Sequence, residues 1–187
     1  MRAHNSEGES RHIRLLDALR ECTPPDTIFA GDACQLVYSG ACALQLPAPR
    51  RWFYPVGYCA LGNALPNAIG IVCARPDQPA IALACDGGIM FTIQELMVAV
   101  ELRLPIAIII WDNAGLKQIR DDMALRDVPA IGVDGINPDF VALARACRAD
   151  AVCPTSMPAF QQHVRSTLAG NVPGVQVVNE QAGWLGG

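Results

Sequence analysis

The sequence predicts an α/β fold of three layers, in which a mostly parallel sheet lies between two layers of helices. Short aliphatic runs bounded by turn residues recur along the chain, and such runs are typical of buried strands. Between them lie segments whose apolar residues recur with the period of a helix. This alternation favours parallel strands joined by helices that cover both faces of the sheet.

The strands are predicted from their apolar residues and from the turns that bound them. Residues 80–84 read Ala-Ile-Ala-Leu-Ala, and residues 105–111 contain four isoleucines before Trp111. Aliphatic runs this short fit strands that are buried on both faces. In chain order, we expect strands at residues 27–30, 80–85, 105–111, 151–153 and 175–178.

The helices are predicted from the spacing of apolar residues and from signals at the helix ends. Within residues 91–102, apolar side chains recur with helical spacing from Ile93 to Val100. Asn137 and Pro138 resemble an N-cap and a first helical residue. We expect helices at residues 13–20, 61–74, 91–102, 116–123, 137–148 and 158–168, one more after Gln35, and a loop at 127–138 that orders around a ligand.

Length and composition indicate one compact domain. The chain has 187 residues, of which 51% are hydrophobic and 17% are charged, as expected for a single α/β unit. We place the domain at residues 13–180, after a flexible lead-in at 1–12 and before a tail at 181–187. No apolar run reaches the roughly 18 residues that span a bilayer. The net charge of −4 gives no nucleic-acid footprint, so we expect neither a membrane nor a nucleic acid as partner.

Eight cysteines raise the question of disulfides or a bound metal. They form no Cys-x-x-Cys pair, and most of them lie among apolar residues. This pattern is typical of small buried side chains in a reducing compartment, so we expect eight free thiols and a cytoplasmic location. Zinc is not expected, because His4, His12 and His163 fall outside finger-like spacings.

Two polar turns follow two of the predicted strands. Asp86, Gly87 and Gly88 come directly after one strand, and Asn113 follows 27 positions after Asp86, with Gly115 close behind. In an open α/β sheet, ligands bind where the carboxyl ends of the strands meet. Oxygen donors of this kind suit a small divalent cation that also takes oxygens from a diphosphate. Taken singly, each turn is also compatible with an ordinary strand-to-helix turn or Asx turn.

Together, the two turns resemble the metal-binding signature of thiamine diphosphate enzymes, whose usual form is Gly-Asp-Gly, a stretch of about this length, and Asn-Asn. The resemblance implies that Mg²⁺ is bound by the Asp86 carboxylate, the Asn113 amide oxygen and the Gly115 backbone carbonyl. Cys85 replaces the first glycine and Asp112 replaces the first asparagine, whereas the three ligand positions are intact.

Further cofactor contacts are implied by the same resemblance. Residues 57–70 are similar to the family segment that precedes the metal motif, with Leu61 where a residue props the bent cofactor and Cys59 where a backbone carbonyl accepts a hydrogen bond from its aminopyrimidine. Leu61 is also compatible with a plain core leucine. The glycines would let backbone N–H groups approach the diphosphate, and Leu116 could line the substrate side. The implied cofactor-binding residues are Ala33, Cys34, Cys59, Leu61, Gly87, Gly88 and Leu116.

From about residue 15 to residue 178, the chain is similar to the diphosphate-binding domain of the acetolactate synthase and 2-oxo acid decarboxylase group. The resemblance implies a subunit or domain of a thiamine diphosphate-dependent decarboxylase or carboligase, which binds Mg²⁺ and needs a pyrimidine-domain partner, with or without self-association. We expect no catalytic residue in this chain, because Glu95 and Glu101 follow the metal motif and lie on the wrong domain to activate the cofactor.

Two alternatives stay open. The chain is also compatible with a truncated or degenerate homologue that keeps the fold without turnover, or with an unrelated α/β nucleotide-binding module. Against the last stands the lack of a Gly-x-Gly-x-x-Gly turn after the first strand.

Overall fold

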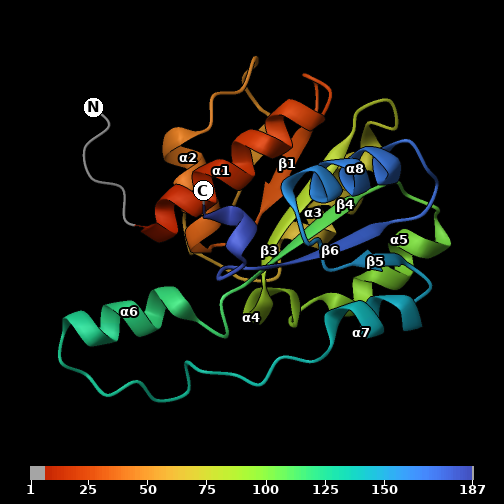
Figure 1. Cartoon of the computed structure of the whole chain (residues 1–187). Coiled ribbons are helices and arrows are strands. Elements are labelled where there is room, and N and C mark those ends of the chain that lie inside the picture. Colours follow the sequence, from red (N-terminus) through yellow and green to blue (C-terminus); the bar gives the residue numbers. More distant parts are fainter. Residues whose placement is uncertain (1–6, 187) are drawn as a thin grey trace.

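The computed structural model describes residues 7–186, which contain one sheet of six parallel strands. The strand order is β2-β1-β3-β4-β6-β5, so β2 and β5 form the two edges. Helices lie on both sides of this sheet, as Figure 1 shows. The strands are β1 (Ile28–Gly31), β2 (Trp52–Phe53), β3 (Ala80–Cys85), β4 (Ala107–Asp112), β5 (Asp150–Val152) and β6 (Gly174–Asn179).

The helices fill the connections between the strands, as the predicted alternation requires. The α-helices are α1 (Glu7–Cys22), α2 (Gln35–Ala43), α3 (Ala64–Ala74), α4 (Asp86–Ile89), α5 (Leu96–Glu101), α6 (Lys117–Leu125), α7 (Phe140–Ala146) and α8 (Met157–Leu168). Two short 3₁₀ turns are η1 (Ile93–Glu95) and η2 (Gly183–Leu185).

Two apolar clusters fill the space between the sheet and its helices. On one face, strand residues such as Leu83 and Ile109 pack against α1, α2 and α8. On the other face, strand residues such as Ala82 and Ile108 pack against α3, α5 and α7. Neighbouring strand residues point to opposite faces, so both faces of each central strand must be apolar. The predicted three-layer α/β/α fold is therefore confirmed.

Strands β3 and β4 set the position of the two polar turns. Cys85 is the register partner of Trp111, so both strands end at the same level of the sheet. Asp86 and the turn that contains Asn113 therefore leave the sheet side by side. Both strands are buried almost throughout, because they lie in the middle of the sheet.

The N-terminal lead-in predicted for residues 1–12 is wrong for residues 7–12, because α1 begins at Glu7 rather than at residue 13. Arg11 forms an ion pair with Glu7 at 2.6 Å, and His12 is buried with its ring 4.9 Å from that of Trp111. At the other end of the chain, the predicted tail packs on the domain through the buried Leu185. Residues 1–6 and 187 lie outside the described residues.

Three local predictions also need correction. Helix α7 begins at Phe140 rather than at residue 137, and its N-cap is Asp139, whose carboxylate accepts a hydrogen bond from the Ala142 N–H at 2.9 Å. Strand β2 was not predicted, because it is only two residues long. Of the eight cysteines, all of which are free thiols here, four are exposed rather than buried, namely Cys42, Cys59, Cys73 and Cys153.

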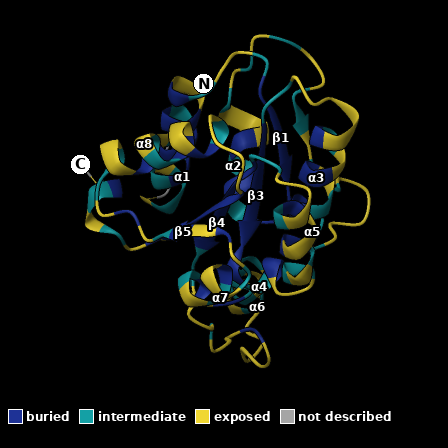
Figure 2. Ribbon diagram, turned by 90° about the vertical axis from the view of Figure 1, so that its right-hand side faces the viewer, coloured by how far each residue is buried: buried dark blue, intermediate teal, exposed yellow. Residues whose placement is uncertain are grey.

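Helix α6 and the loop that follows it lie apart from the layered body, below it in Figure 1. Figure 2 shows that most of this segment is exposed. Its apolar side chains include Leu125, Ile131 and Ile136, with exposed fractions of 84%, 76% and 102%. Among residues 7–186, no helix is long and apolar enough to cross a membrane.

Candidate functional site

A cavity of about 300 Å³ lies at the carboxyl-terminal edge of the sheet. Its wall comes from the loops after β1 and β4, from the end of β3 and from the segment before α3. We call it the cofactor cavity, because residues that the sequence resemblance predicts to bind the cofactor or its metal line it. They are Ala33, Cys34, Cys59, Leu61, Asn113, Gly115 and Leu116. The fold therefore brings together residues that are far apart in the sequence.

Asp86 lies behind this wall, fully buried at the start of α4. Its Oδ2 atom accepts hydrogen bonds from the Gly115 N–H at 2.7 Å and from the Asn137 side-chain amide at 2.8 Å. Burial raises the pKa of this carboxyl group above its usual value, and the hydrogen bonds from Asn137, Gly115 and Gly87 partly offset that rise. A nearby cation would favour the ionised form.

Two buried oxygen atoms at this place have no hydrogen-bond partner among residues 7–186. They are Oδ1 of Asp86 and the side-chain Oδ1 of Asn113. Buried polar atoms in folded proteins nearly always have a partner, so an orphaned pair at one site needs an explanation. Both are hard oxygen donors, the kind that Mg²⁺ prefers. The residues present therefore fit a small divalent cation.

The turn from Asp112 to Leu116 holds Asn113 in place. Ala114 and Gly115 both adopt positive φ angles, 62° and 133°, and the Ala114 N–H donates to Oδ1 of Asp112 at 3.2 Å. A Cβ atom at Gly115 would lie 2.3 Å from the Val133 carbonyl oxygen, so only glycine fits there. The Leu116 N–H donates to the same oxygen at 2.8 Å, which joins this turn to the loop after α6.

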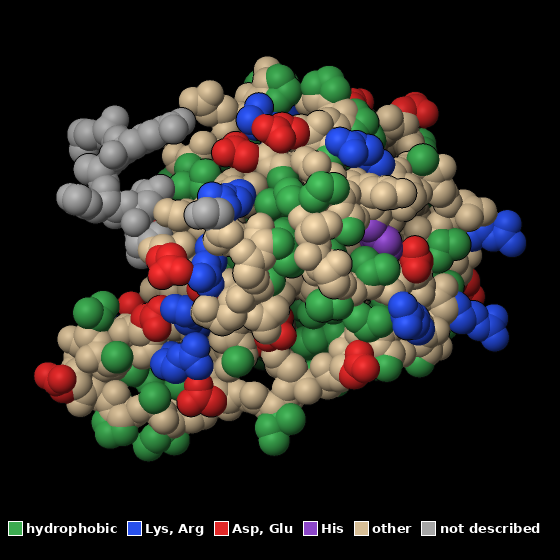
Figure 3. Space-filling model, viewed as in Figure 1, with side chains coloured by type: hydrophobic (Ala, Val, Ile, Leu, Met, Phe, Trp, Pro, Cys, Tyr) green, Lys and Arg blue, Asp and Glu red, His purple; other side chains and the backbone are tan. Residues whose placement is uncertain are grey.

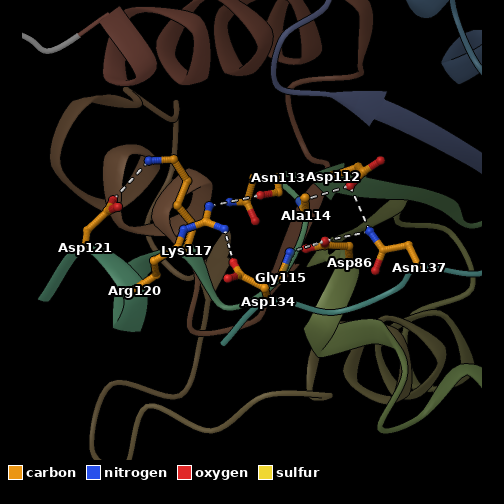
Figure 4. A network of polar contacts seen from close by, with 10 residues as sticks. All are labelled: Asp86, Asp112, Asn113, Ala114, Gly115, Lys117, Arg120, Asp121, Asp134 and Asn137. Carbon is orange, nitrogen blue, oxygen red and sulfur yellow. Dashed lines mark hydrogen bonds and ion pairs between the residues drawn. The ribbon is translucent and has the colours of Figure 1, made fainter. Parts of the chain in front are cut away.

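Figure 4 shows how the polar groups around this turn are connected. Arg120 on α6 contacts Asp134 at 2.5 Å and the Asn113 carbonyl at 3.4 Å. Lys117 donates to the Asp121 carboxylate at 3.0 Å. Burial alone would raise the pKa of Asp121, but the hydrogen bonds from Lys117 and Gln35 lower it below its usual value. Asp121 therefore stays ionised within a paired network.

The two predicted glycines of α4 lie where larger side chains would not fit. A Cβ atom at Gly87 would lie 3.0 Å from Leu116 and 3.8 Å from the Gly115 carbonyl oxygen. At Gly88, a Cβ atom would lie 2.7 Å from Asp32 and 2.9 Å from the Cys85 sulfur. Gly88 is thus required by packing, and neither glycine is among the residues that line the cofactor cavity.

The remaining predicted residues lie on the other side of the cofactor cavity. Leu61 is partly buried, and Cys59 adopts a φ of 48°, which turns the chain sharply in front of α3. Ala33 and Cys34 follow β1, and the Ala33 N–H donates to the Ala60 carbonyl at 3.3 Å. Contact with the Cys85 thiol, together with burial, raises the pKa of the Cys34 thiol well above its usual value. Cys34 is therefore a neutral thiol.

Sequence reasoning missed two residues that organise the site. Asn137 bridges Asp86 and Asp112, donating to their carboxylates at 2.8 and 2.9 Å. Its place before Pro138 suggested a helix cap. No local signal in the sequence indicates that it contacts Asp86, which lies 51 residues earlier at the end of a strand. Asp32 accepts hydrogen bonds from the N–H groups of Asn63 and Ala64, at 2.6 and 2.8 Å, and so caps α3. No local signal indicates that role, because Asp32 precedes α2 in the sequence and α3 begins 32 residues later.

The fold and the site define a parallel α/β domain with a cation-compatible corner beside a cavity at the carboxyl ends of its strands. Residues 32–179 match the family model of the thiamine pyrophosphate enzymes, C-terminal thiamine pyrophosphate-binding domain. The chain belongs to this family, as the sequence resemblance predicted. Its cofactor is accordingly thiamine pyrophosphate, also called thiamine diphosphate.

Individual relatives agree with this assignment. The chain is 36% identical over 167 residues to a probable 2-ketoarginine decarboxylase of Pseudomonas aeruginosa, covering 89% of this chain and 30% of that protein. It is 32% identical over 114 residues to the large subunit of acetolactate synthase isozyme 1 of Escherichia coli, covering 61% of this chain and 20% of that protein. The chain thus spans about a third or less of these relatives' length.

The fold also matches solved structures of this kind. A thiamine diphosphate-dependent 4-hydroxybenzoylformate decarboxylase of Rhodococcus jostii superimposes with a TM-score of 0.82 and 25% identity, over 90% of this chain and 32% of that one. The decarboxylase and acetolactate synthase types of this domain are therefore the ones that the chain resembles.

Proposed function

We propose that this chain holds the diphosphate of thiamine diphosphate through one Mg²⁺ ion. The ion would be bound by Oδ1 of Asp86, Oδ1 of Asn113 and the Gly115 carbonyl. The observation that carries this proposal is the pair of buried oxygen atoms, on Asp86 and Asn113, that have no partner within the described chain. The other carboxylate oxygen of Asp86, Oδ2, is already held by two hydrogen bonds. Oδ1 is therefore the oxygen that remains available to a cation.

The other predicted residues would position the cofactor. We place the diphosphate against the backbone N–H groups of Gly87 and Gly88, of which Gly87 is partly exposed and Gly88 is buried. Leu61 would support the bend between the two rings, and the Cys59 carbonyl would accept a hydrogen bond from the aminopyrimidine. When bound, thiamine diphosphate supplies the nucleophilic carbon and the electron sink for decarboxylation of a 2-oxo acid. The chain's own residues bind and orient it.

We further propose that turnover needs a pyrimidine-binding domain, from another chain or from another part of a longer polypeptide. Exposed apolar side chains support this, some next to Cys59 in the sequence and others on the loop after α6. Tyr58 is 96% exposed and Val56 is 65% exposed on one side, and Ile131 and Ile136 extend along the loop after α6. Figure 3 shows hydrophobic side chains along the lower edge of the molecule, where α6 and the loop after it lie in the same view in Figure 1. Exposed apolar surface of this kind marks an interaction site, for such a domain or for a second copy of the chain.

For the substrate, we propose a 2-oxo acid with a cationic side chain. Asp122 on α6 lines the cofactor cavity and is exposed, with a contact to Gln118 at 3.3 Å. Asp121 lies next to it but is already paired with Lys117. An available carboxylate on the wall of the cavity would favour a guanidinium or ammonium group. The name of the 36% identical relative, a probable 2-ketoarginine decarboxylase, supports the same class.

A second candidate is a homologue that binds the cofactor without turnover. Ala33 and Cys34 favour it, because an alanine side chain donates no hydrogen bond to a diphosphate and a thiol donates only weakly. A cytoplasmic location, in keeping with eight free thiols, is part of either proposal.

Calorimetry and a decarboxylation assay test these proposals. Thiamine diphosphate should bind the purified chain with Mg²⁺ and not in the presence of EDTA. Release of CO₂ from 2-ketoarginine should appear only after a pyrimidine-binding domain is added, and it should exceed release from pyruvate. Binding without CO₂ release under any condition would favour the second candidate. Rapid turnover by the chain alone would contradict the need for a partner domain.

A further inference from the structure

A second large cavity, of about 620 Å³, lies between α3 and the edge strand β2. It shares no lining residue with the cofactor cavity. Its walls come from residues 49–53 on one side and from α3 on the other, and Ile28, at the amino end of β1, forms part of the floor. Figure 2 shows α3 beside β1. The volume falls within the range of small-molecule sites in proteins.

Three arginines line this cavity, namely Arg50, Arg51 and Arg75. No aspartate or glutamate lines it. Within residues 7–186, none of these three side chains makes an ion pair or a side-chain hydrogen bond, whereas Arg11 and Arg120 pair with carboxylates. Three unpaired guanidinium groups on one cavity, in a chain of net charge −4, indicate an anionic ligand.

Two residues of this cavity each carry a buried polar atom that has no partner within the described part of the chain. Nε of Arg51 is a donor that lacks an acceptor, and Oε1 of Gln78 is an acceptor that lacks a donor. A simple anion would satisfy the arginine but not the glutamine. A ligand that carries hydroxyl or amino groups as well as an anionic group satisfies both.

Apart from Asn67, the rest of the lining is apolar and leaves room for a flat group. Phe53, Pro66 and Ile71 contribute apolar surface, and Phe53 is 44% exposed. A Cβ atom at Gly70 would meet nothing within 4 Å, so the face of α3 is open at this point. Guanidinium groups also stack on flat rings, which suits the same kind of ligand.

We propose that this arginine-lined cavity is a second ligand site, which binds a phosphate ester that carries a flat ring and hydroxyl or amino donors. A nucleoside diphosphate has this combination. The guanidinium groups bind the phosphates, Gln78 accepts a hydrogen bond from a hydroxyl or amino group, and the ring lies on the apolar surface beside Gly70.

Calorimetry of the full chain with adenosine 5′-diphosphate tests this site, in EDTA so that metal-dependent binding at Asp86 does not contribute. The chain should bind the nucleotide, and the double variant Arg50→Gln/Arg75→Gln should bind it at least about tenfold more weakly. The matched control Arg126→Gln/Arg148→Gln removes the same number of positive charges outside this cavity and should change the affinity by less than about twofold.

Gly70 offers a test that leaves the charges unchanged. Both alanine and leucine suit a helix, so neither replacement should disturb α3. Gly70→Leu should fill the cavity and abolish binding, whereas the smaller side chain of Gly70→Ala should leave binding intact. In an amide and side-chain nitrogen spectrum, the Nε–H signal of Arg51 should shift when the nucleotide is added.

Four results would overturn the proposal. They are no binding of the nucleotide up to about 5 mM, equal affinity for inorganic phosphate, loss of binding in Asp86→Ala, and unchanged binding in Gly70→Leu. Equal affinity for phosphate would mean that the ring is not recognised. Loss in Asp86→Ala would mean that the nucleotide occupies the cofactor cavity instead.

Discussion

The corner around Asp86 and the segment formed by α6 and its following loop lie side by side, yet they are built in opposite ways. At the corner, Asp86 is fully buried, and its carboxylate is held by the backbone of Gly115 and the side chain of Asn137. In the α6 segment, no residue of the helix is buried, and Ile136 is 102% exposed. The corner is thus held by contacts within the described chain, including Asn137 of the loop after α6, whereas the exposed side chains of the α6 segment offer apolar surface to a partner.

This difference indicates that the two regions have different roles, the corner in binding a metal ion and the α6 segment in contacting a partner. A metal corner needs fixed donor atoms before the ion arrives, and buried hydrogen bonds supply that rigidity. A surface that docks on a partner needs only to present apolar side chains, and it gains its order from the contact. The predictions below test each half of this comparison, from the largest expected effect to the smallest.

The largest effect is expected from Asp86→Ala. Removing the only charged ligand should weaken Mg²⁺-dependent binding of thiamine diphosphate by about 100-fold or more, measured by calorimetry. Circular dichroism should show that the fold persists, because no apolar packing is lost. Asp77→Ala removes a carboxylate outside the site and serves as the control. If Asp86→Ala kept the affinity of the unmodified chain, the metal assignment would be wrong.

Gly115→Ala should destabilise the fold as well as the site. The new Cβ atom would lie 2.3 Å from the Val133 carbonyl oxygen at a φ of 133°. We expect a loss of about 2–4 kcal/mol in the free energy of unfolding, measured by urea denaturation.

Gly132→Ala is the matched control, because Gly132 also has a positive φ, 72°, but its Cβ atom would meet nothing within 4 Å. It should cost only about 1 kcal/mol. Equal losses in the two variants would show that close packing at the corner does not matter.

Asn113→Ala should weaken Mg²⁺-dependent cofactor binding by about tenfold, less than Asp86→Ala, because water can replace a neutral amide oxygen. The fold should keep its stability within about 1 kcal/mol, since the Oδ1 atom of Asn113 has no partner to lose. A larger effect on folding than on binding would contradict its role as a metal ligand.

In the α6 segment, Ile131→Ser and Ile136→Ser should leave the stability of the isolated chain within about 0.5 kcal/mol. Both side chains are largely exposed, so little buried contact is lost. Association with a pyrimidine-binding domain, measured by analytical ultracentrifugation, should weaken by about tenfold. Unchanged association would show that this surface is not the interface.

The smallest effect concerns thiol reactivity. Cys34 and Cys85 are buried at the site and should react slowly with iodoacetamide, whereas the exposed Cys73 and Cys153 should react fast. The raised pKa of Cys34 slows it further. After denaturation without reductant, mass spectrometry should find all eight cysteines alkylated, and any blocked pair would contradict their assignment as free thiols.

The same contrast explains what the sequence could predict. The central strands β3 and β4 were predictable because their apolar runs are local signals, and the turns after them carry Asp86 and Asn113 at fixed distances from those runs. Asn137 was not predictable as part of the site, because its contact to Asp86 depends on how the loop after α6 returns to the sheet. The start of α1 was missed because its first turns are polar and are stabilised by tertiary contacts of Arg11 and His12.

The measurement that tests the central claim most directly is ³¹P relaxation of thiamine diphosphate in the presence of Mn²⁺, which accepts the same oxygen ligands as Mg²⁺. If Asp86, Asn113 and Gly115 hold one ion against the diphosphate, the chain should greatly increase relaxation of both phosphorus signals. That increase should disappear in Asp86→Ala. Equal relaxation in the two proteins would contradict a metal-held diphosphate at this corner.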